Sequence, residues 1–156
     1  MLPMPKYAFL LPAYKVNYLE SAIHSIISQT YSNLRLIISD DCSPADIRGV
    51  YERYSSDPRI SYRRNESNIG AESLVDHWNL LLNQCDSEYV IVASDDDVYA
   101  PDFLSEVDKM VCAYPEVDLF HVRANVIDEN GTIQSEDPLS APFLFSFYAL
   151  GVCFGR

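Results

Sequence analysis

Tyr7–Leu11, with the sequence YAFLL, is a continuous apolar run near the start of the chain. A short run of this kind is typical of a β-strand that is buried on both faces of a sheet. The apolar residues that come next recur at the spacing of an amphipathic helix, namely at Leu19, Ala22, Ile23, Ile26 and Ile27. These residues predict a first strand followed by a helix that packs on the sheet.

The same alternation of strand and helix continues along the chain. Leu34–Ile38, Ile60–Arg63 and Tyr89–Ala93 are the next predicted strands, and each is followed by apolar residues at helical spacing. A fifth strand is expected over Leu119–Ile127. Four strand–helix units in a row predict an α/β fold, with a mostly parallel, Rossmann-like sheet and helices on both faces. The third of these helices is expected to pack through Leu74, Val75, Trp78, Leu81 and Leu82.

The length and composition are those of one globular domain over residues 1–156. Hydrophobic residues make up 48% of the chain and charged residues 22%, which excludes a disordered protein. The net charge of −12 argues against a nucleic-acid partner, because phosphate backbones are bound by clustered Lys and Arg. The longest apolar stretch, residues 142–154, is shorter than the ~20 residues of a transmembrane helix. We therefore expect a cytoplasmic protein without a transmembrane segment, which a fuller chain could place at the inner face of the membrane.

Acidic residues follow two of the predicted strands. Asp40 and Asp41 end the second strand, and Asp95–Asp97 follow the fourth. The carboxyl ends of parallel strands lie at one edge of the sheet, where α/β proteins bind their ligands. Carboxylates of this kind suit Mg²⁺ or Mn²⁺, which bridge to substrate phosphates. The alternative interpretation is a set of solvated turns whose acids favour the N-terminus of the next helix.

Two common nucleotide-binding classes are excluded by the first strand–helix loop. That loop contains no glycine, whereas a dinucleotide site and a P-loop both need a glycine-rich turn there. A nucleotidyltransferase of related fold also usually carries a glycine-rich, basic first loop.

Five segments in this order resemble the amino-terminal part of the family 2 inverting glycosyltransferases, which have the GT-A fold. They are Phe9–Tyr14, Leu19–Tyr31, Leu36–Ser43, Arg64–Gly70 and Asp95–Pro101. The resemblance implies a nucleotide-diphosphate sugar as donor, usually a UDP-sugar, and a divalent cation, Mg²⁺ or Mn²⁺. It also implies that the hydroxyl of a carbohydrate or lipid-linked acceptor attacks the sugar in one inverting displacement.

The resemblance also implies roles for individual residues. Pro12, Ala13 and Tyr14 would line the pocket for the nucleotide base, and Asp41 would accept a hydrogen bond from that base.

Five further residues would complete the donor site. Asn68 and Gly70 would shape the loop beside the base, and Arg64 would lie in the same wall. Asp95 or Asp96 would hold the ribose and the metal, with Asp96 as the residue chosen for the cation.

The sequence departs from the family's pattern in three places. Ser94–Asp97 stands where the family commonly has Asp-x-Asp-Asp, and His77–Asn79 stands where it often has Ala-Arg-Asn. The family's catalytic base lies well downstream, and the sequence ends at Arg156 before such a segment. No residue is therefore assigned as the base. The chain alone is expected to bind the donor and to transfer sugar poorly or not at all.

Two hypotheses remain beside this one, namely the nucleotidyltransferase of related fold and a module without catalytic activity. The chain could be a non-catalytic nucleotide-sugar-binding or regulatory module of the same fold, such as a phospho-acceptor domain. That class needs a lysine on a later strand, and the only lysines are Lys6, Lys15 and Lys109. Self-association is also predicted, through an apolar patch that consists of Phe143, Phe145, Phe147 and Tyr148.

Overall fold

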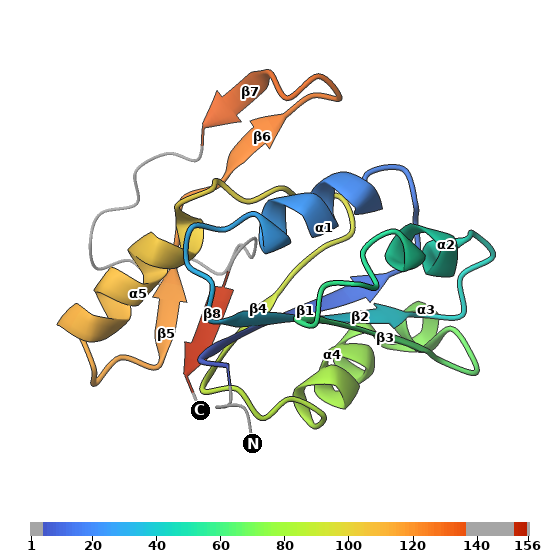
Figure 1. Cartoon of the computed structure of the whole chain (residues 1–156), viewed down its shortest axis with the longest axis horizontal. Coiled ribbons are helices and arrows are strands. Elements are labelled where there is room, and N and C mark those ends of the chain that lie inside the picture. The colour runs from blue at the N-terminus through green and yellow to red at the C-terminus, as the bar shows by residue number, and fades with distance from the viewer. Residues whose placement is uncertain (1–4, 137–151, 156) are drawn as a thin grey trace.

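A six-stranded sheet forms the centre of the protein (Figure 1). The computed structural model describes residues 5–136 and 152–155, so the predicted patch of Phe143 to Tyr148 lies outside the described residues. The strand order is β3-β2-β1-β4-β8-β5, and β8 runs antiparallel to both of its neighbours. The predicted α/β fold with a mostly parallel sheet is confirmed. The strands are β1 (Tyr7–Ala13), β2 (Leu34–Asp40), β3 (Ile60–Arg64), β4 (Tyr89–Val92), β5 (Leu119–His121) and β8 (Val152–Gly155).

Helices cover both faces of this sheet (Figure 1). Side chains of β1 alternate between two hydrophobic clusters, as the period of two in a strand requires. Tyr7 and Phe9 pack in the larger cluster with α1, α2 and α5, whereas Ala8 and Leu10 pack in the smaller cluster with α4. The helices are α1 (Leu19–Ile27), α2 (Ile47–Glu52), α3 (Ile69–Glu72), α4 (Leu74–Leu82) and α5 (Phe103–Ala113). No helix in the described part of the chain is long and apolar enough to cross a membrane.

The predicted fifth strand is wrong in its extent. β5 ends at His121, and β6 (Asn125–Ile127) pairs with β7 (Ile133–Glu136) in a separate two-stranded sheet. The turn between β6 and β7 is closed by Asp128, whose Oδ1 accepts hydrogen bonds from two backbone N–H groups of the turn. Gly131 has a φ of 79°, which a residue with a side chain rarely adopts. Residues 122–124 separate β5 from β6, so the predicted single strand is two short strands, and the turn pairs the second of them with β7.

Helix α4 buries a different face from the one expected. His77 and Leu81 are its buried residues, while Leu74 is 49% exposed and Val75 58% exposed. The helix starts at Ser73, whose side chain accepts a hydrogen bond from the backbone N–H of Asp76. This start places the residues at positions 77 and 81 against the sheet. A polar residue therefore occupies a core position that counting apolar residues does not identify.

The order of the strands determines where a ligand can bind. From β1 the chain moves outward to β2 and β3, and it then returns to place β4 on the other side of β1. Ligands of open α/β sheets bind at the carboxyl ends of the strands at such a reversal. The ends of β1 and β4 are therefore the expected place for the site.

Gln29 fixes the loop that follows β4. Its side chain is almost fully buried, at 6% exposure. The amide nitrogen donates hydrogen bonds to the carbonyl oxygens of Ser25 (3.0 Å) and Ala100 (2.8 Å), and the amide oxygen accepts one from the backbone N–H of Leu104 (2.9 Å). The side chain thus connects α1 to the segment between Asp97 and α5.

Replacement of Gln29 tests this connection. Gln29→Leu would leave the N–H of Leu104 and two carbonyl groups without their partner in a buried place. We expect the free energy of unfolding to fall by about 3 kcal/mol, measured by urea denaturation. Arg48→Ala is the control, because the Arg48–Glu52 pair is exposed on α2 and should change stability little. A loss as small as that of the control would contradict the connection.

Candidate functional site

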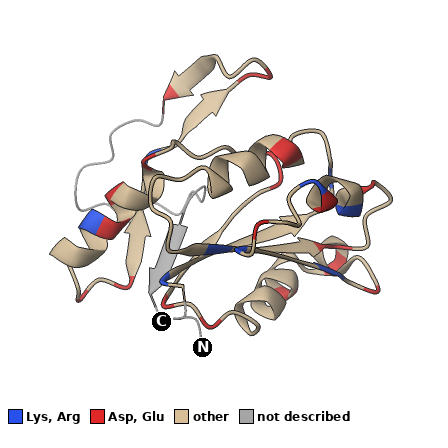
Figure 2. Ribbon diagram, in the orientation of Figure 1, with Lys and Arg blue, Asp and Glu red and all other residues tan. Residues whose placement is uncertain are grey.

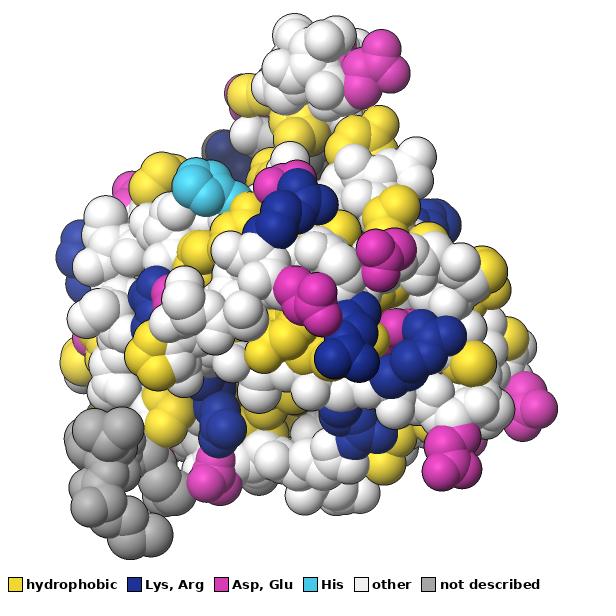
Figure 3. Space-filling model, turned by 45° about the vertical axis from the view of Figure 1, so that its right-hand side comes forward, with side chains coloured by type: hydrophobic (Ala, Val, Ile, Leu, Met, Phe, Trp, Pro, Cys, Tyr) yellow, Lys and Arg dark blue, Asp and Glu magenta, His cyan; other side chains and the backbone are white. Residues whose placement is uncertain are grey.

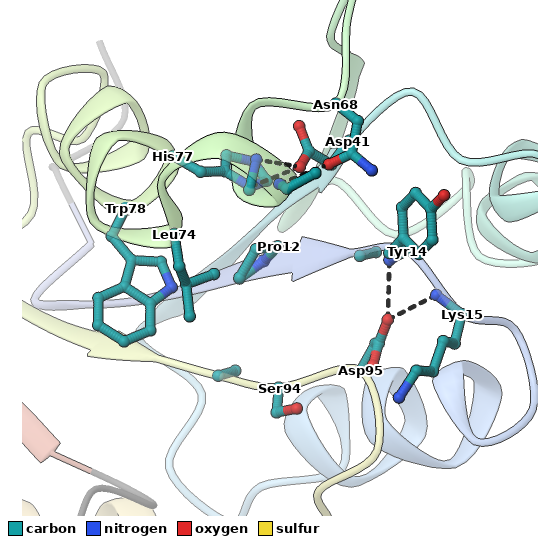
Figure 4. Close-up of a pocket in the computed structure, with 14 residues that line it drawn as sticks. Pro12, Tyr14, Lys15, Asp41, Asn68, Leu74, His77, Trp78, Ser94 and Asp95 are labelled. Carbon is teal, nitrogen blue, oxygen red and sulfur yellow. Dashed lines mark hydrogen bonds and ion pairs between the residues drawn. The ribbon is translucent and has the colours of Figure 1, made fainter.

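A cavity of about 450 Å³ lies at the carboxyl ends of β1 and β4 (Figure 4). Its walls come from the end of β1, the residue after β2, helices α3 and α4, and the residues after β4. The structure brings seven of the nine predicted site residues together in its lining, and Arg64 and Asp96 are outside it. The seven are Pro12, Ala13, Tyr14, Asp41, Asn68, Gly70 and Asp95.

Asp41 is buried at one end of the cavity, at 4% exposure. Its Oδ1 accepts hydrogen bonds from Asn65 Nδ2 (2.7 Å) and the backbone N–H of Ile69 (3.0 Å), and its Oδ2 accepts one from the backbone N–H of Gly70 (2.7 Å). Burial raises the pKa of this carboxyl, but the three hydrogen bonds outweigh burial and bring the pKa below its usual value. Asp41 is therefore ionised at neutral pH.

The loop beside Asp41 has the shape that this carboxylate requires. Asn68 caps α3, with its side chain accepting a hydrogen bond from the backbone N–H of Ala71 (2.9 Å). A Cβ atom at Gly70 would lie 2.8 Å from Asp41 Oδ2, closer than the two atoms can approach. Glycine at this position therefore lets the backbone N–H reach the carboxylate.

Arg64 lies on the other face of the sheet. Its guanidinium pairs with Asp40 Oδ2 and also donates to the carbonyl oxygen of Ser43 (2.9 Å). Asp40 is fully buried and accepts a further hydrogen bond from the hydroxyl of Tyr62 (2.7 Å), whose pKa is raised to about 12 by burial and by Asp40. Alternation along β2 and β3 places these side chains away from the cavity. The prediction that Arg64 lies in the cavity wall is therefore wrong, and its guanidinium stabilises the loop after β2 instead.

Asp95 joins the ends of β1 and β4. Its Oδ2 accepts hydrogen bonds from the backbone N–H groups of Tyr14 (2.8 Å) and Lys15 (2.7 Å) (Figure 4). Asp96 is exposed and accepts a hydrogen bond from the hydroxyl of Ser94. Burial, followed by the charges of Asp96 and Asp95, raises the pKa of Asp97 to about 6. Three adjacent acids thus repel one another at this edge of the cavity.

The acidic loop has the chemistry of a partial site for a hard cation. Within the described ranges, no three His, Cys, Asp or Glu side chains converge so that they could enclose a metal ion. Asp96 and the free oxygen of Asp95 could supply one or two ligands. This number fits Mg²⁺ or Mn²⁺, which usually keep several waters and complete their coordination with substrate phosphates.

The far wall of the cavity comes from α4. Leu74 and the half-buried Trp78 lie one helical turn apart and both line the cavity, across from Tyr14, which is 42% exposed (Figure 4). Sequence reasoning placed Leu74 and Trp78 in the core. Their spacing of four residues shows only that they share a face of the helix, and the sequence carries no signal that the face of the polar His77 meets the sheet instead.

Acidic residues outnumber basic ones over the whole chain, and both are spread over loops and helices (Figure 2). On the face in Figure 3, basic side chains lie beside acidic ones, in agreement with the ion pairs Arg48–Glu52 and Arg53–Glu20. Lys15 is the only Lys or Arg that lines the cavity, and the described part of the chain gives its ammonium group no ion pair. Among the described residues, Lys15 therefore supplies the cavity with one positive charge that no ion pair uses.

The fold and this cavity define an α/β domain with a ligand site at the strand reversal. The model of the family described as "Glycosyl transferase family 2" matches residues 9–150. The chain therefore belongs to glycosyl transferase family 2.

Two relatives indicate how the domain is used elsewhere. Protein CgeD of Bacillus subtilis is 30% identical over 130 residues, which are 80% of this chain and 30% of the relative. The Campylobacter jejuni GalNAc(5)-diNAcBac-PP-undecaprenol beta-1,3-glucosyltransferase is 33% identical over 96 residues, which are 60% of this chain and 30% of that protein. The chain thus spans about 30% of the length of these relatives.

Solved structures share the fold at lower sequence identity. S. aureus TarS 1-349 in complex with UDP has a TM-score of 0.72 at 20% identity, over 83% of this chain and 38% of TarS. Mannosyltransferase PcManGT from Pyrobaculum calidifontis, in complex with GDP-Man and Mn2+, has a TM-score of 0.63 at 21% identity, over 76% and 35% of the two chains.

The ionised state of Asp41 predicts how stability depends on pH. Because the pKa of Asp41 is lower in the folded chain than in the unfolded chain, its contribution is present above pH ~3.8 and is lost as the pH falls through the folded pKa. Asp41→Asn places an amide nitrogen against backbone N–H donors, and we expect a loss of about 3 kcal/mol at pH 7. This difference should be complete at pH 5 and should shrink as the pH falls below ~3.8, as measured by urea denaturation. The exposed variant Asp118→Asn should follow the wild type throughout.

Proposed function

We propose that this chain is the donor-binding domain of a glycosyltransferase and that its cavity binds a nucleotide-diphosphate sugar, preferably a UDP-sugar. The observation that carries the proposal is the pairing of Asp41, a buried ionised acceptor at one end of the cavity, with the acidic loop Asp95–Asp97 at the other. A nucleotide has a hydrogen-bonding base at one end and a diphosphate that binds metal at the other. Family membership and the UDP complex of TarS support this assignment.

The base would lie between Tyr14 and the α4 wall, with its polar edge at Asp41. The Oδ1 atom of Asp41 already accepts two hydrogen bonds, from Asn65 and Ile69, whereas Oδ2 accepts one, from Gly70. One carboxylate oxygen accepts about two hydrogen bonds, so Oδ2 has room for a single donor. Uracil presents one N–H between two carbonyl groups, whereas guanine presents two adjacent N–H donors that match both oxygens of a carboxylate. The availability of only one acceptor favours uracil.

The ribose and the diphosphate would extend toward the loop after β4. Asp95 would meet the ribose, Asp96 would hold Mg²⁺ or Mn²⁺, and Lys15 would lie near the phosphates. The Mn2+ complex of the Pyrobaculum mannosyltransferase supports a divalent cation in this fold. Such a cation would neutralise the charge of the departing diphosphate.

The full enzyme would transfer the sugar with inversion to the hydroxyl of a carbohydrate or a lipid-linked acceptor. A base would remove the proton of that hydroxyl while the diphosphate departs. We assign no residue as this base. The name of the Campylobacter jejuni relative supports the lipid-linked class of acceptor, and such an acceptor would place the domain at the cytoplasmic face of a membrane.

Calorimetric titration with UDP, with and without Mn²⁺, tests the donor site. We expect wild-type binding to strengthen at least tenfold with Mn²⁺ and this gain to disappear in Asp96→Ala, because the carboxylate that holds the cation is lost. Asp118→Ala, an exposed acid outside the cavity, is the matched control and should behave as the wild type. Absence of UDP binding under both conditions would refute the proposed function.

The choice of base can be measured separately. UDP should bind at least tenfold more tightly than GDP, and N3-methyl-UDP should lose at least tenfold in affinity relative to UDP, because the methyl group removes the donor to Asp41. In Asp41→Asn this penalty should be much smaller. Equal affinities of the wild type for UDP and N3-methyl-UDP would show that Asp41 does not read the base.

A further inference from the structure

His77 is a buried titratable residue in the cavity lining for which the proposed function gives no role. It lies on α4 and is 1% exposed. Its Nδ1 is 3.4 Å from Asp41 Oδ2 (Figure 4). Its Nε2 is 2.9 Å from the Ser39 hydroxyl and 3.3 Å from Asn65 Nδ2. Every polar atom of the ring therefore faces a polar atom of the sheet or of its loops.

The orientation of the Asn65 amide is fixed by two neighbours of opposite character. Arg63 Nη2 donates to Asn65 Oδ1 (2.7 Å), and a guanidinium cannot accept. Asn65 Nδ2 donates to Asp41 Oδ1 (2.7 Å), and an ionised carboxylate cannot donate. The atom of Asn65 that faces the imidazole is therefore Nδ2, a donor.

This orientation in turn determines the tautomer of His77. Because Asn65 Nδ2 can only donate, Nε2 of the ring must carry the lone pair, and the Ser39 hydroxyl can donate to it as well. The proton then sits on Nδ1 and faces Asp41 Oδ2. The other tautomer would set a lone pair against the carboxylate and an N–H against the Asn65 amide.

We propose that His77, held as the Nδ1–H tautomer through Arg63 and Asn65, is a positioning residue that orients Asp41 for the nucleobase. The Nδ1 contact is longer than a good hydrogen bond, so it directs Oδ2 without occupying it fully. The lone pair that remains on Oδ2 is the one a base N–H would use. The part of this inference that concerns ligand binding rests on the proposed function.

Protonation of His77 would disturb this arrangement. The imidazolium would present an N–H to Asn65 Nδ2, and its charge would draw Asp41 away from a ligand. The charged groups that face the ring are Asp41, after β2, and Arg63, from β3. Burial lowers the pKa of His77 most, Asp41 raises it, and Arg63 lowers it, which leaves the pKa below 6.5. His77 is thus neutral at pH 7.5, and its ring gains a proton only as the pH falls below 6.5.

The tautomer can be observed without any ligand. Nitrogen-15 spectra of the histidine rings at pH 7.5 should show His77 with a protonated Nδ1 and an unprotonated Nε2, and the signals are assigned by their loss in His77→Asn. A protonated Nε2 at this pH would overturn the proposal.

The positioning role is tested by titration with uridine, which has no phosphate that could titrate or bind a metal. Wild-type affinity should fall between pH 7.5 and pH 5.5 by up to about tenfold, because the pKa of His77 lies below 6.5 and part of the protein keeps a neutral ring at pH 5.5. In His77→Asn the amide nitrogen can take the place of Nδ1, so affinity at pH 7.5 should stay within about threefold and should not change with pH. In His77→Gln the amide reaches the position of Nε2 instead, and affinity should be about tenfold lower at both pH values.

Equal effects of the Asn and Gln variants, or a pH dependence that survives in His77→Asn, would indicate a merely structural residue and would overturn the positioning role. If the wild type binds neither uridine nor UDP, the proposed function fails. The proposal for His77 then depends on the ring spectra alone, where the Nδ1–H tautomer supports it and the Nε2–H tautomer refutes it.

Discussion

The carboxylate of Asp41 is a negative charge that β2 delivers into a buried position, and much of the site depends on how that charge is satisfied. Water cannot do so at 4% exposure, so protein donors must. Asn65 and the backbone N–H groups of Ile69 and Gly70 supply the hydrogen bonds. These bonds hold the loop before α4 against the end of β2. The same interaction therefore forms the bottom of the cavity and determines where its far wall begins.

A second carboxylate acts in a similar way on the other side of β1. Asp95 accepts hydrogen bonds from the backbone N–H groups of Tyr14 and Lys15, so the loop after β4 is held at the end of β1. Gln29 supports this loop from α1, through the carbonyl of Ala100 and the N–H of Leu104. Under the proposed function Asp95 holds the backbone with Oδ2 and leaves its other oxygen to the ligand, whereas Oδ2 of Asp41 accepts from the backbone of Gly70 and would also meet the ligand. Removal of either would then change the shape of the cavity as well as its chemistry.

The strands were predictable because each is a short apolar run, and the acids were placed correctly at one edge because parallel strands end together. Because successive side chains of a strand point to opposite faces of the sheet, adjacent residues of the same type can lie on different faces. Asp40 points to the face of α2 and pairs with Arg64, whereas Asp41 points to α4 and the cavity. Sequence reasoning assigned Arg64 to the pocket because it did not apply this alternation. It also could not foresee that α4 would bury His77. A polar residue is stable in the core only if it has hydrogen-bonding partners, and those of His77 come from β2, β3 and the residues that follow them.

The acidic loop bears on how an acidic chain could bind an anionic ligand. The net charge is −12, and among the residues that the structure describes Lys15 is the only Lys or Arg in the cavity lining. Direct attraction of a diphosphate is therefore weak, and three adjacent acids would oppose it. Burial raises the pKa of Asp97 to about 6, and the charges of Asp96 and Asp95 add to this effect. Under the proposed function a divalent cation between these acids and the phosphates would offset their mutual repulsion, so that the same acids become favourable. Under the proposed function the acidic loop would make binding of the diphosphate conditional on the cation, while Asp41 and His77 would govern binding of the base independently of it.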